Sequence, residues 1–263
     1  MVNYDLTEYE CFISGTSSGL GSFLLKKFSG NAIARDVKVK DHSGPSKRER
    51  IIVHTAFNSS KHFKAKDLYQ HAADNIFLTK RLLSLPHDRF VFISTIEVYP
   101  LGNAIKLEDE EIDVSAVMNL YGHSKLVCES LVNKYGSGAL ILRAGLLVGS
   151  GMRANNFTRL MGDGDAKLSL SASSKFYICH YDFLSEFIAF CCNTNVRGTF
   201  NFVPSDSITL KQLASNYYRQ CEFGDFIYDS GSVSNNKIVG IDSRFNFSSY
   251  DSVNKYIENL GGI

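Results

Sequence analysis

The chain lacks several features that would point to particular classes of protein. Its 28 basic and 27 acidic side chains leave a formal net charge of +1, which gives no argument for nucleic acid or an anionic membrane as a general partner. No apolar run approaches the roughly 18 residues of a membrane-spanning helix. The first residues, MVNYDLTEYECFISG, contain no basic stretch followed by an apolar one. We therefore expect no secretory signal and a cytoplasmic location.

The cysteines lack the spacing of a metal site or of a disulfide framework. None of the six forms a Cys-x-x-Cys pair, most lie within apolar runs, and the seven histidines are scattered. We predict reduced cysteines in the core and no metal site. The chain has no repeats and no low-complexity tracts. Its 263 residues are enough for one large domain, or for a main domain with a smaller appendage.

The N-terminal segment has the pattern of a strand, a glycine-rich turn and a helix. The apolar residues 9–13 run directly into the turn, and residues 23–28 present an apolar helical face. Glycines let the backbone approach a diphosphate, and a helix N-terminus supplies free N–H groups and partial positive charge. The Gly-x-x-x-Gly-x-Gly spacing is not the commoner Gly-x-Gly-x-x-Gly and could belong to a flexible turn, but its context favours nucleotide binding. The candidate cofactor-binding residues are Gly15, Ser17, Ser18, Gly19, Leu20 and Gly21.

A second strand is predicted over residues 31–39, with its end near Arg35 and Asp36. That end lies about 20 residues past the first glycine, where a side chain that reads the cofactor ribose is expected. Asp36 would bind the 2′-hydroxyl of NAD, whereas Arg35 would accommodate the 2′-phosphate of NADP. Both are present, and Lys38 and Lys40 shift the balance slightly to NADP. Solvated loop charges are the alternative interpretation.

The rest of the chain alternates buried strands with helices. Strands are predicted over 51–57, 89–94 and 139–148, and helices over 65–85 and 117–135, so we expect an α/β, doubly wound parallel sheet covered on both faces. Beyond Gly151 the elements become short: 155–161, 183–193, 210–219 and 251–260 as helices, and 175–182 and 199–203 as extended segments. We divide the chain into a nucleotide-binding part, 1–150, and an interleaved substrate-binding lobe, 151–263, that does not fold independently.

Tyr121 and Lys125 are four residues apart and lie on one face of their predicted helix. A phenol titrates near pH 10 and is a poor base at neutral pH, but a nearby ammonium lowers that pKa. Tyr-x-x-x-Lys alone is a weak signal, and a tyrosine at the core edge beside a solvated lysine would also produce it. The hydroxyls of Ser94 and Thr95 strengthen it, because ligands of such sheets bind beyond the carboxyl ends of strands.

Taken in order, these segments resemble the extended branch of the short-chain dehydrogenase/reductase superfamily, the NAD-dependent epimerases, dehydratases and reductases of nucleotide sugars. The resemblance covers nearly the whole chain. Two departures are Ser18, where that branch usually has glycine, and Pro100, where glycine is frequent. The matching segments are Gly15–Gly21, Val53–Ala56, Asn75, Ser94-Thr95-x-x-Val98-Tyr99, Tyr121-x-x-x-Lys125, Leu142–Gly145 and Lys175–Ile178 through Asp182.

The resemblance implies a Rossmann-type fold, an NAD or NADP cofactor, and a role for each matching residue. Tyr121 would be the general acid/base, Lys125 would lower its pKa and bind the nicotinamide ribose, and Thr95 would bond the reacting oxygen, with Ser94 as the less favoured choice. Further cofactor contacts would come from Thr55, Ala56, Asn75 and Ser94. Substrate phosphates would be bound by Lys175 and, less clearly, Arg153.

The residues after Thr95 bear on the reaction. Sugar 4,6-dehydratases of this family carry an Asp-Glu acid/base pair there, and this chain has Ile96 and Glu97; Glu97 could still act as a base, but its acid partner is missing. The resemblance therefore favours an NAD(P)-dependent 4-keto reductase of a nucleotide-linked sugar. A nucleotide-sugar epimerase, a non-catalytic cofactor-binding regulator and an oxidoreductase for a steroid, flavonoid or aldehyde remain alternatives. A homodimer formed through helices 65–85 and 117–135 is expected by the resemblance alone.

Overall fold

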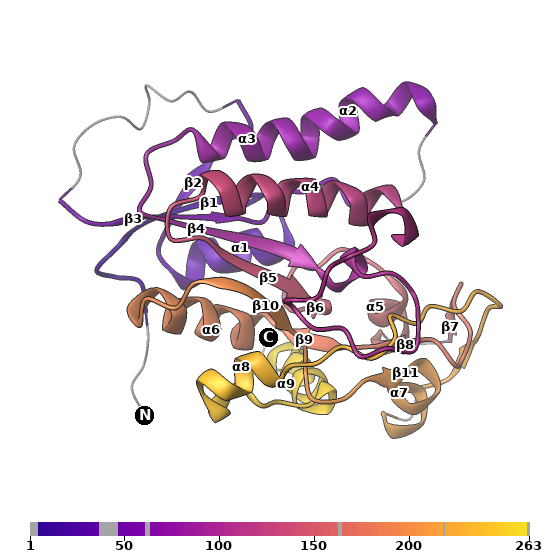
Figure 1. The fold of residues 1–263 in the computed structure, drawn as a ribbon. Coiled ribbons are helices and arrows are strands. Elements are labelled where there is room, and N and C mark those ends of the chain that lie inside the picture. Colours follow the sequence, from indigo (N-terminus) through magenta and orange to yellow (C-terminus); the bar gives the residue numbers. More distant parts are fainter. Residues whose placement is uncertain (1–4, 37–46, 61–63, 163–164, 218, 262–263) are drawn as a thin grey trace.

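The computed structural model describes residues 5–36, 47–60, 64–162, 165–217 and 219–261, and it is organised around a parallel sheet (Figure 1). Lys38 and Lys40 lie outside the described residues. The six strands are in the order β10-β5-β4-β3-β1-β2, and every neighbouring pair is parallel. The predicted α/β fold class is therefore confirmed. The strands are β1 (Glu10–Ser14), β2 (Asn31–Ile33), β3 (Arg50–His54), β4 (Arg89–Thr95), β5 (Leu140–Ala144) and β10 (Gly198–Phe202).

Helices cover both faces of the sheet, because successive strand residues point to opposite sides. In β3, Ile51 packs in a cluster with Leu24 of α1 and Phe187 of α6. Its neighbour Ile52 packs with Leu82 of α3 and Val132 of α4. Figure 1 shows the two helical layers on either side of the strands. The helices are α1 (Gly19–Lys27) and α6 (Tyr181–Asn193) on one face, and α2 (Leu68–Ala72), α3 (Leu78–Leu83) and α4 (Leu120–Tyr135) on the other.

Three predicted elements differ in detail from the observed ones. The predicted strand 139–148 is split into β5 and β6 (Leu146–Val148). At the break, a Cβ on Gly145 would lie 2.3 Å from the carbonyl oxygen of Tyr177. The backbones therefore approach closely there, and β6 pairs with β9 (Ile178–His180) instead of the main sheet. The predicted strand 31–39 ends at Ile33, level with the last residue of β1. The predicted helix 65–85 contains a π-helical turn, Ala73–Phe77, between α2 and α3.

The C-terminal lobe has its own apolar cluster beside the sheet. Phe157, Leu213 and Val253 pack there with Ile178 of β9. Both α6 and β10 follow residue 151 in sequence but belong to the main layers, so the chain crosses between the two parts more than once. The lobe's remaining elements are α5 (Asn156–Met161), β7 (Ala166–Lys167), β8 (Lys175–Phe176), β11 (Ile208–Thr209), α7 (Leu210–Asn216), β12 (Cys221–Glu222), α8 (Asn236–Ile241) and α9 (Ser249–Gly261).

The structure bears on the predictions for the cysteines and for membrane-spanning segments. All six cysteines are free, and all but Cys221 are buried, as predicted for core residues. Within the described ranges, no helix is both long and apolar enough to cross a membrane.

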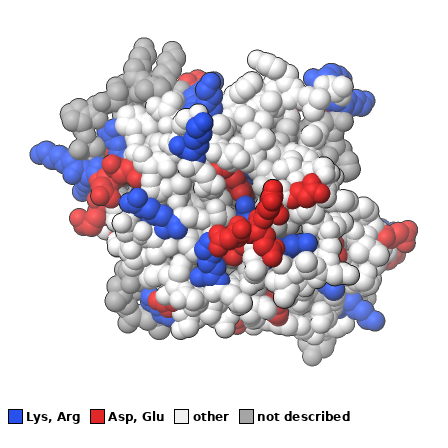
Figure 2. Space-filling model, in the orientation of Figure 1, with Lys and Arg blue, Asp and Glu red and all other residues white. Residues whose placement is uncertain are grey.

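On the face shown in Figure 2, basic and acidic side chains are interspersed, and a group of acidic ones lies near the middle of the view.

Candidate active site

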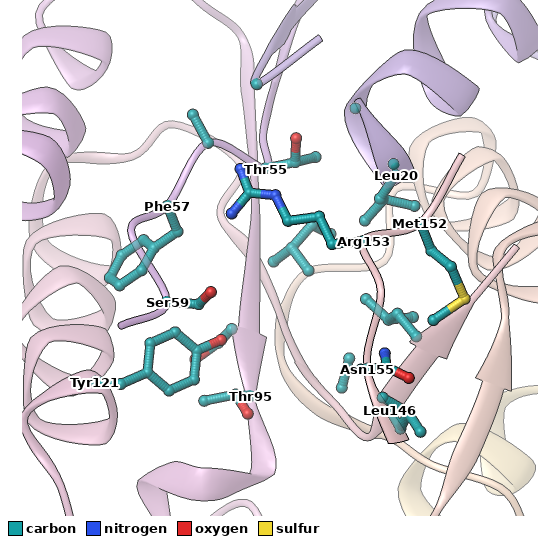
Figure 3. Close-up of a pocket in the computed structure, with 18 of the residues that line it drawn as sticks. Leu20, Thr55, Phe57, Ser59, Thr95, Tyr121, Leu146, Met152, Arg153 and Asn155 are labelled. Carbon is teal, nitrogen blue, oxygen red and sulfur yellow. The ribbon is translucent and has the colours of Figure 1, made fainter. Parts of the chain in front are cut away.

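A cleft of about 790 Å³ opens at the carboxyl ends of the strands. It lies where the strand order reverses, since β2 and β3 flank β1 on opposite sides. In open α/β sheets this is the position at which nucleotides bind. The walls of the cleft on the side of the main sheet are the glycine-rich turn, the ends of β3 and β4, and the side chains of Tyr121 and Lys125 on α4. The C-terminal lobe contributes Met152 and Arg153 (Figure 3). It also contributes the aromatic residues Phe176, Phe226 and Tyr228.

The glycine-rich turn requires its glycines for steric reasons. Gly15 has φ +76°, and a Cβ there would lie 2.7 Å from the backbone nitrogen of Ala56. A Cβ on Gly21 would lie 2.2 Å from the carbonyl oxygen of Gly15. The Thr55 hydroxyl donates to the carbonyl oxygen of Ser14 at 2.6 Å, which ties the turn to the end of β3. All the predicted turn residues line the cleft. Ser18, the N-cap residue of α1, makes no side-chain capping bond and lines the cleft, so this end of the helix borders the cleft, as an anion site would. The Gly19 N–H donates to the carbonyl oxygen of Gly151 at 2.9 Å.

The two candidate ribose-reading residues occupy different positions. Arg35 lines the cleft, whereas Asp36 is exposed and is not among the residues that form its walls. The Arg35 Nη1 lies 2.5 Å from Oδ1 of Asp74, and 61% of the Arg35 side chain remains exposed. Of the pair, Arg35 is therefore the one placed to meet a ligand in this cleft.

Close backbone packing brings α4 against the end of β4. A Cβ on Gly122 would lie 2.4 Å from the carbonyl oxygen of Glu97, so only glycine fits. Asn119 caps the helix, accepting from the Gly122 N–H at 2.9 Å, and donates to the Glu97 carboxylate at 3.1 Å. This arrangement positions the first turn of α4, which carries Tyr121, above Thr95 at the end of β4.

Tyr121 and Thr95 meet within the cleft, as their side chains in Figure 3 indicate. Burial and the negative charge of Glu97 raise the pKa of Tyr121, and the hydrogen bond with Thr95 opposes this shift only in part. The pKa is therefore raised, whereas the sequence interpretation expected Lys125 to lower it. Tyr121 is a neutral phenol at neutral pH, which makes it a proton donor.

The position of Lys125 explains this difference. Its Nζ donates to the carbonyl oxygen of Ile93 at 2.5 Å and lies 5.8 Å from the ring centre of Tyr121. Only 3% of Lys125 is exposed. Burial lowers its pKa to about 7, although Cys128 and Glu129 act in the opposite direction. Neutral and charged forms are thus both present near neutral pH, and the stabilisation of a nearby phenolate is correspondingly weak.

The adjacent residues Ser94 and Thr95 make hydrogen bonds to different groups. The Ser94 hydroxyl donates to Oε1 of Glu129 at 2.5 Å, within a buried network in which Arg143 Nη2 lies 2.8 Å from Oε2 of the same carboxylate. Thr95 is the hydroxyl that bonds to Tyr121. The preference for Thr95 over Ser94 as the residue next to the reacting oxygen agrees with this geometry.

Of three further predicted site residues, Arg153 lines the cleft, whereas Asn75 and Lys175 do not. Asn75 is fully buried and holds the segment after β3, with bonds of 2.7 and 3.1 Å to the backbone of Asn58. It does not line the cleft. Lys175 also lies outside the lining and pairs with Asp229 at 3.4 Å. Arg153 does line the cleft, and its side chain extends across it in the direction of Thr55 (Figure 3).

Two aromatic residues of the cleft have no counterpart in the sequence predictions. Tyr228 stacks on Phe176 with ring centres 5.0 Å apart and hydrogen-bonds to Glu97. Phe57, directly after the strand-end segment Val53–Ala56, contacts Tyr121 edge-on at 5.6 Å. Tyr228 lies in a segment with no periodic pattern, so its sequence carries no signal for this position. Phe57 could have been suspected from its place immediately beyond a matching motif.

The fold and the cleft define a Rossmann-type α/β protein in which Tyr121, Lys125 and Thr95 line one cleft at the carboxyl ends of the strands. Among the described residues, no group of three or more His, Cys, Asp or Glu side chains could hold a metal ion. Residues 38–163 match the model of the NAD dependent epimerase/dehydratase family. The matched segment is just under half of the chain, and it agrees with the resemblance that the ordered motifs indicate, to a family of epimerase and dehydratase enzymes. No curated protein sequence matches the chain.

Solved structures with the same fold include three different activities. A UDP-glucuronic acid 4-epimerase from Bacillus cereus, in complex with UDP-glucuronic acid and NAD, is 16% identical; the match covers 96% of this chain and 99% of that one, with a TM-score of 0.74. A dTDP-4-dehydrorhamnose reductase from Bacillus anthracis, in complex with NADP, is 15% identical over 95% and 99% of the chains, with a TM-score of 0.74. An NAD-dependent NDP-hexosamine 5,6-dehydratase is 14% identical over 97% and 98%, with a TM-score of 0.76. At these identities the comparison shows the shared fold.

Proposed function

We propose that the chain is an NAD(P)-dependent reductase of a nucleotide-linked 4-keto sugar. One observation carries the proposal: the hydrogen-bonded pair of Tyr121 and Thr95 lies in the same cleft as the glycine-rich turn at Gly15–Gly21. The turn, with the N-terminus of α1 at the edge of the cleft, suits the diphosphate of a dinucleotide. The family match and the nucleotide-sugar ligands of similar structures support the substrate class.

In the proposed reduction, Tyr121 is the proton donor. When bound, the reduced cofactor supplies a hydride to the carbonyl carbon. Thr95 donates a hydrogen bond to the carbonyl oxygen, and Tyr121 transfers its phenolic proton to that oxygen as the C–H bond forms. The electron pair of the C=O π bond becomes the new O–H bond. Burial and the charge of Glu97 raise the pKa of Tyr121, so at neutral pH the phenol carries the proton that this reduction uses.

The proposal is tested with the purified chain, NADPH or NADH, and a panel of UDP-, GDP-, dTDP- and CDP-linked 4-keto sugars. Consumption of reduced nicotinamide is followed by absorbance, and the alcohol product is identified by mass spectrometry. Turnover of one member of the panel is the expected result. Absence of cofactor binding by calorimetry, together with no turnover, would reject the proposal.

The position of Arg35 supports NADP over NAD. A charged hydrogen bond contributes about 1.5–3 kcal/mol, and the exposure of Arg35 places the effect at the lower end. Arg35→Met should therefore weaken NADPH binding by about tenfold and change NADH binding by less than about twofold. Calorimetric titration of both cofactors measures the difference, with Lys211→Met as a control on an exposed site of α7. Equal weakening of both cofactors would show that Arg35 does not read the 2′-phosphate.

Tyr228 supports a second candidate function, a nucleotide-sugar dehydratase. Its phenol lies next to Glu97. In this chain Ile96 stands where the sugar dehydratases of the family have the aspartic acid of their Asp-Glu pair. Glu97 could then take a proton from carbon while Tyr228 protonates the leaving hydroxyl, which departs as water. If so, Tyr228→Phe should slow water loss from a nucleotide hexose supplied with NAD by about a hundredfold. Mass spectrometry measures this loss, with the exposed Tyr69→Phe as control; wild-type protein that releases no water excludes this candidate.

The same assays distinguish an epimerase and a non-catalytic regulator from the proposed reductase. An epimerase would interconvert sugar epimers without net consumption of cofactor, and the retained Tyr121 and Lys125 suit it as well as they suit a reductase. A non-catalytic regulator would bind the cofactor but turn over no sugar. The expected homodimer stays a prediction; large exposed apolar side chains on its two helical segments, including Tyr69 and Phe77 on one and Val127 on the other, support it.

A further inference from the structure

The Lys125 ammonium group lies against two phenylalanine rings. Its Nζ lies 3.7 Å from the ring centre of Phe57 and 4.6 Å from that of Phe92. Nζ donates a hydrogen bond to the carbonyl oxygen of Ile93 in β4 and lies farther from Tyr121, 5.8 Å from its ring centre. In its charged form Lys125 has three N–H donors, and aromatic faces attract the cation without offering an acceptor oxygen. We call this position of Lys125, with Nζ bonded to Ile93 and covered by the two rings, its retracted state. In it, Nζ has more N–H donors than the one hydrogen bond to Ile93 uses.

Phe57 is the part of this enclosure that can move. Phe92 is fully buried within β4, whereas Phe57 is half-buried, follows the end of β3 and forms part of the cleft wall. Its neighbour Asn58 is fixed by two hydrogen bonds to Asn75, so the backbone is anchored. Rotation of the Phe57 side chain towards the open cleft is then the motion that uncovers Nζ.

We propose that Phe57 is a positioning residue that holds Lys125 in its retracted state, and that the nicotinamide half of the cofactor binds only when this ring turns away. The inference rests on the proposed function, in which Lys125 meets the nicotinamide ribose. Sugar hydroxyls would give the spare donors of Nζ the acceptors that the rings lack. Part of the binding free energy of the whole cofactor is thus used to separate the ring from the cation.

The expected sign of a Phe57 substitution distinguishes this role from ordinary packing. If the ring obstructs Lys125, Phe57→Leu should bind NADPH or NADH about tenfold more tightly than wild type, since a desolvated cation–π contact contributes up to about 2 kcal/mol. If the ring packs against the bound nicotinamide, the same variant should bind more weakly. Phe57→Tyr keeps the aromatic face and should behave as wild type.

Calorimetric titration with two ligands provides the test. The first is NADPH or NADH, whichever the wild type binds more tightly; the second is 2′,5′-ADP or ADP, which lacks the nicotinamide ribose. The inference requires tighter binding of the whole cofactor by Phe57→Leu and a change of less than about twofold for the fragment. Weaker or unchanged binding of the whole cofactor overturns it. Circular dichroism confirms that each variant is folded.

A ligand-free measurement separates failure of this inference from failure of the proposed function. Acetylation of Lys125 by acetic anhydride is followed by peptide mass spectrometry in protein without cofactor. Wild type and Phe57→Tyr should react slowly, and Phe57→Leu should react at least about tenfold faster because the amine becomes accessible. Equal rates overturn the inference. If the rates differ but the wild type binds no dinucleotide, the retraction of Lys125 stands and the proposed function fails.

Discussion

Tyr121→Phe is expected to reduce turnover by about two to four orders of magnitude, the usual contribution of a positioned proton donor. The substitution removes one oxygen atom and keeps the ring that contacts Phe57. Cofactor affinity should change by less than about threefold, because the glycine-rich turn and Arg35 are untouched. Steady-state kinetics and calorimetry with the cofactor measure the two effects separately.

Tyr135→Phe is the matched control, since Tyr135 lies on the same helix and is 58% exposed. It should leave both quantities unchanged. A parallel loss of turnover and cofactor binding in Tyr121→Phe would instead indicate a structural role. The pH profile adds a further check. Because the pKa of Tyr121 is raised above that of an ordinary phenol, the donor stays protonated across the neutral range, and the rate of reduction should be insensitive to its ionisation there.

Glu129→Ala is expected to lower the free energy of unfolding by about 3–5 kcal/mol, as when one partner of a buried ion pair is removed. Glu129 is 3% exposed and Arg143 is 7% exposed. Loss of the carboxylate leaves the guanidinium charge buried without its partner at 2.8 Å and takes away the acceptor of the Ser94 hydroxyl. Urea unfolding followed by circular dichroism gives the change.

Glu186→Ala on α6, where the side chain is exposed, should cost less than about 0.5 kcal/mol under the same conditions. Replacing both partners, with Glu129→Met and Arg143→Met together, should recover part of the stability, because no unpaired charge then remains in the core. A cost below about 1 kcal/mol for Glu129→Ala would mean that water or another group compensates Arg143.

The sequence by itself determined the elements that depend on local spacing. Alternating apolar strands and helices predicted the parallel sheet, and the glycines at 15, 19 and 21 predicted a turn that the structure finds sterically restricted to glycine at Gly15 and Gly21. Four-residue spacing was enough to place Tyr121 and Lys125 on one face of α4. These features depend on backbone geometry within a few consecutive residues, so each can be predicted from its own segment of the sequence.

Only the tertiary structure decided what those side chains meet. Ser94 and Thr95 are adjacent hydroxyl residues at the end of β4, yet Ser94 bonds to Glu129, 35 positions away, and Thr95 to Tyr121. The retraction of Lys125 under Phe57, and the arrival of Tyr228 beside Glu97, likewise depend on distant segments. A pKa is set by burial and by neighbouring charges, and both are properties of the folded chain. The chemistry of Tyr121 was therefore located by the sequence, but its protonation state was fixed by the fold.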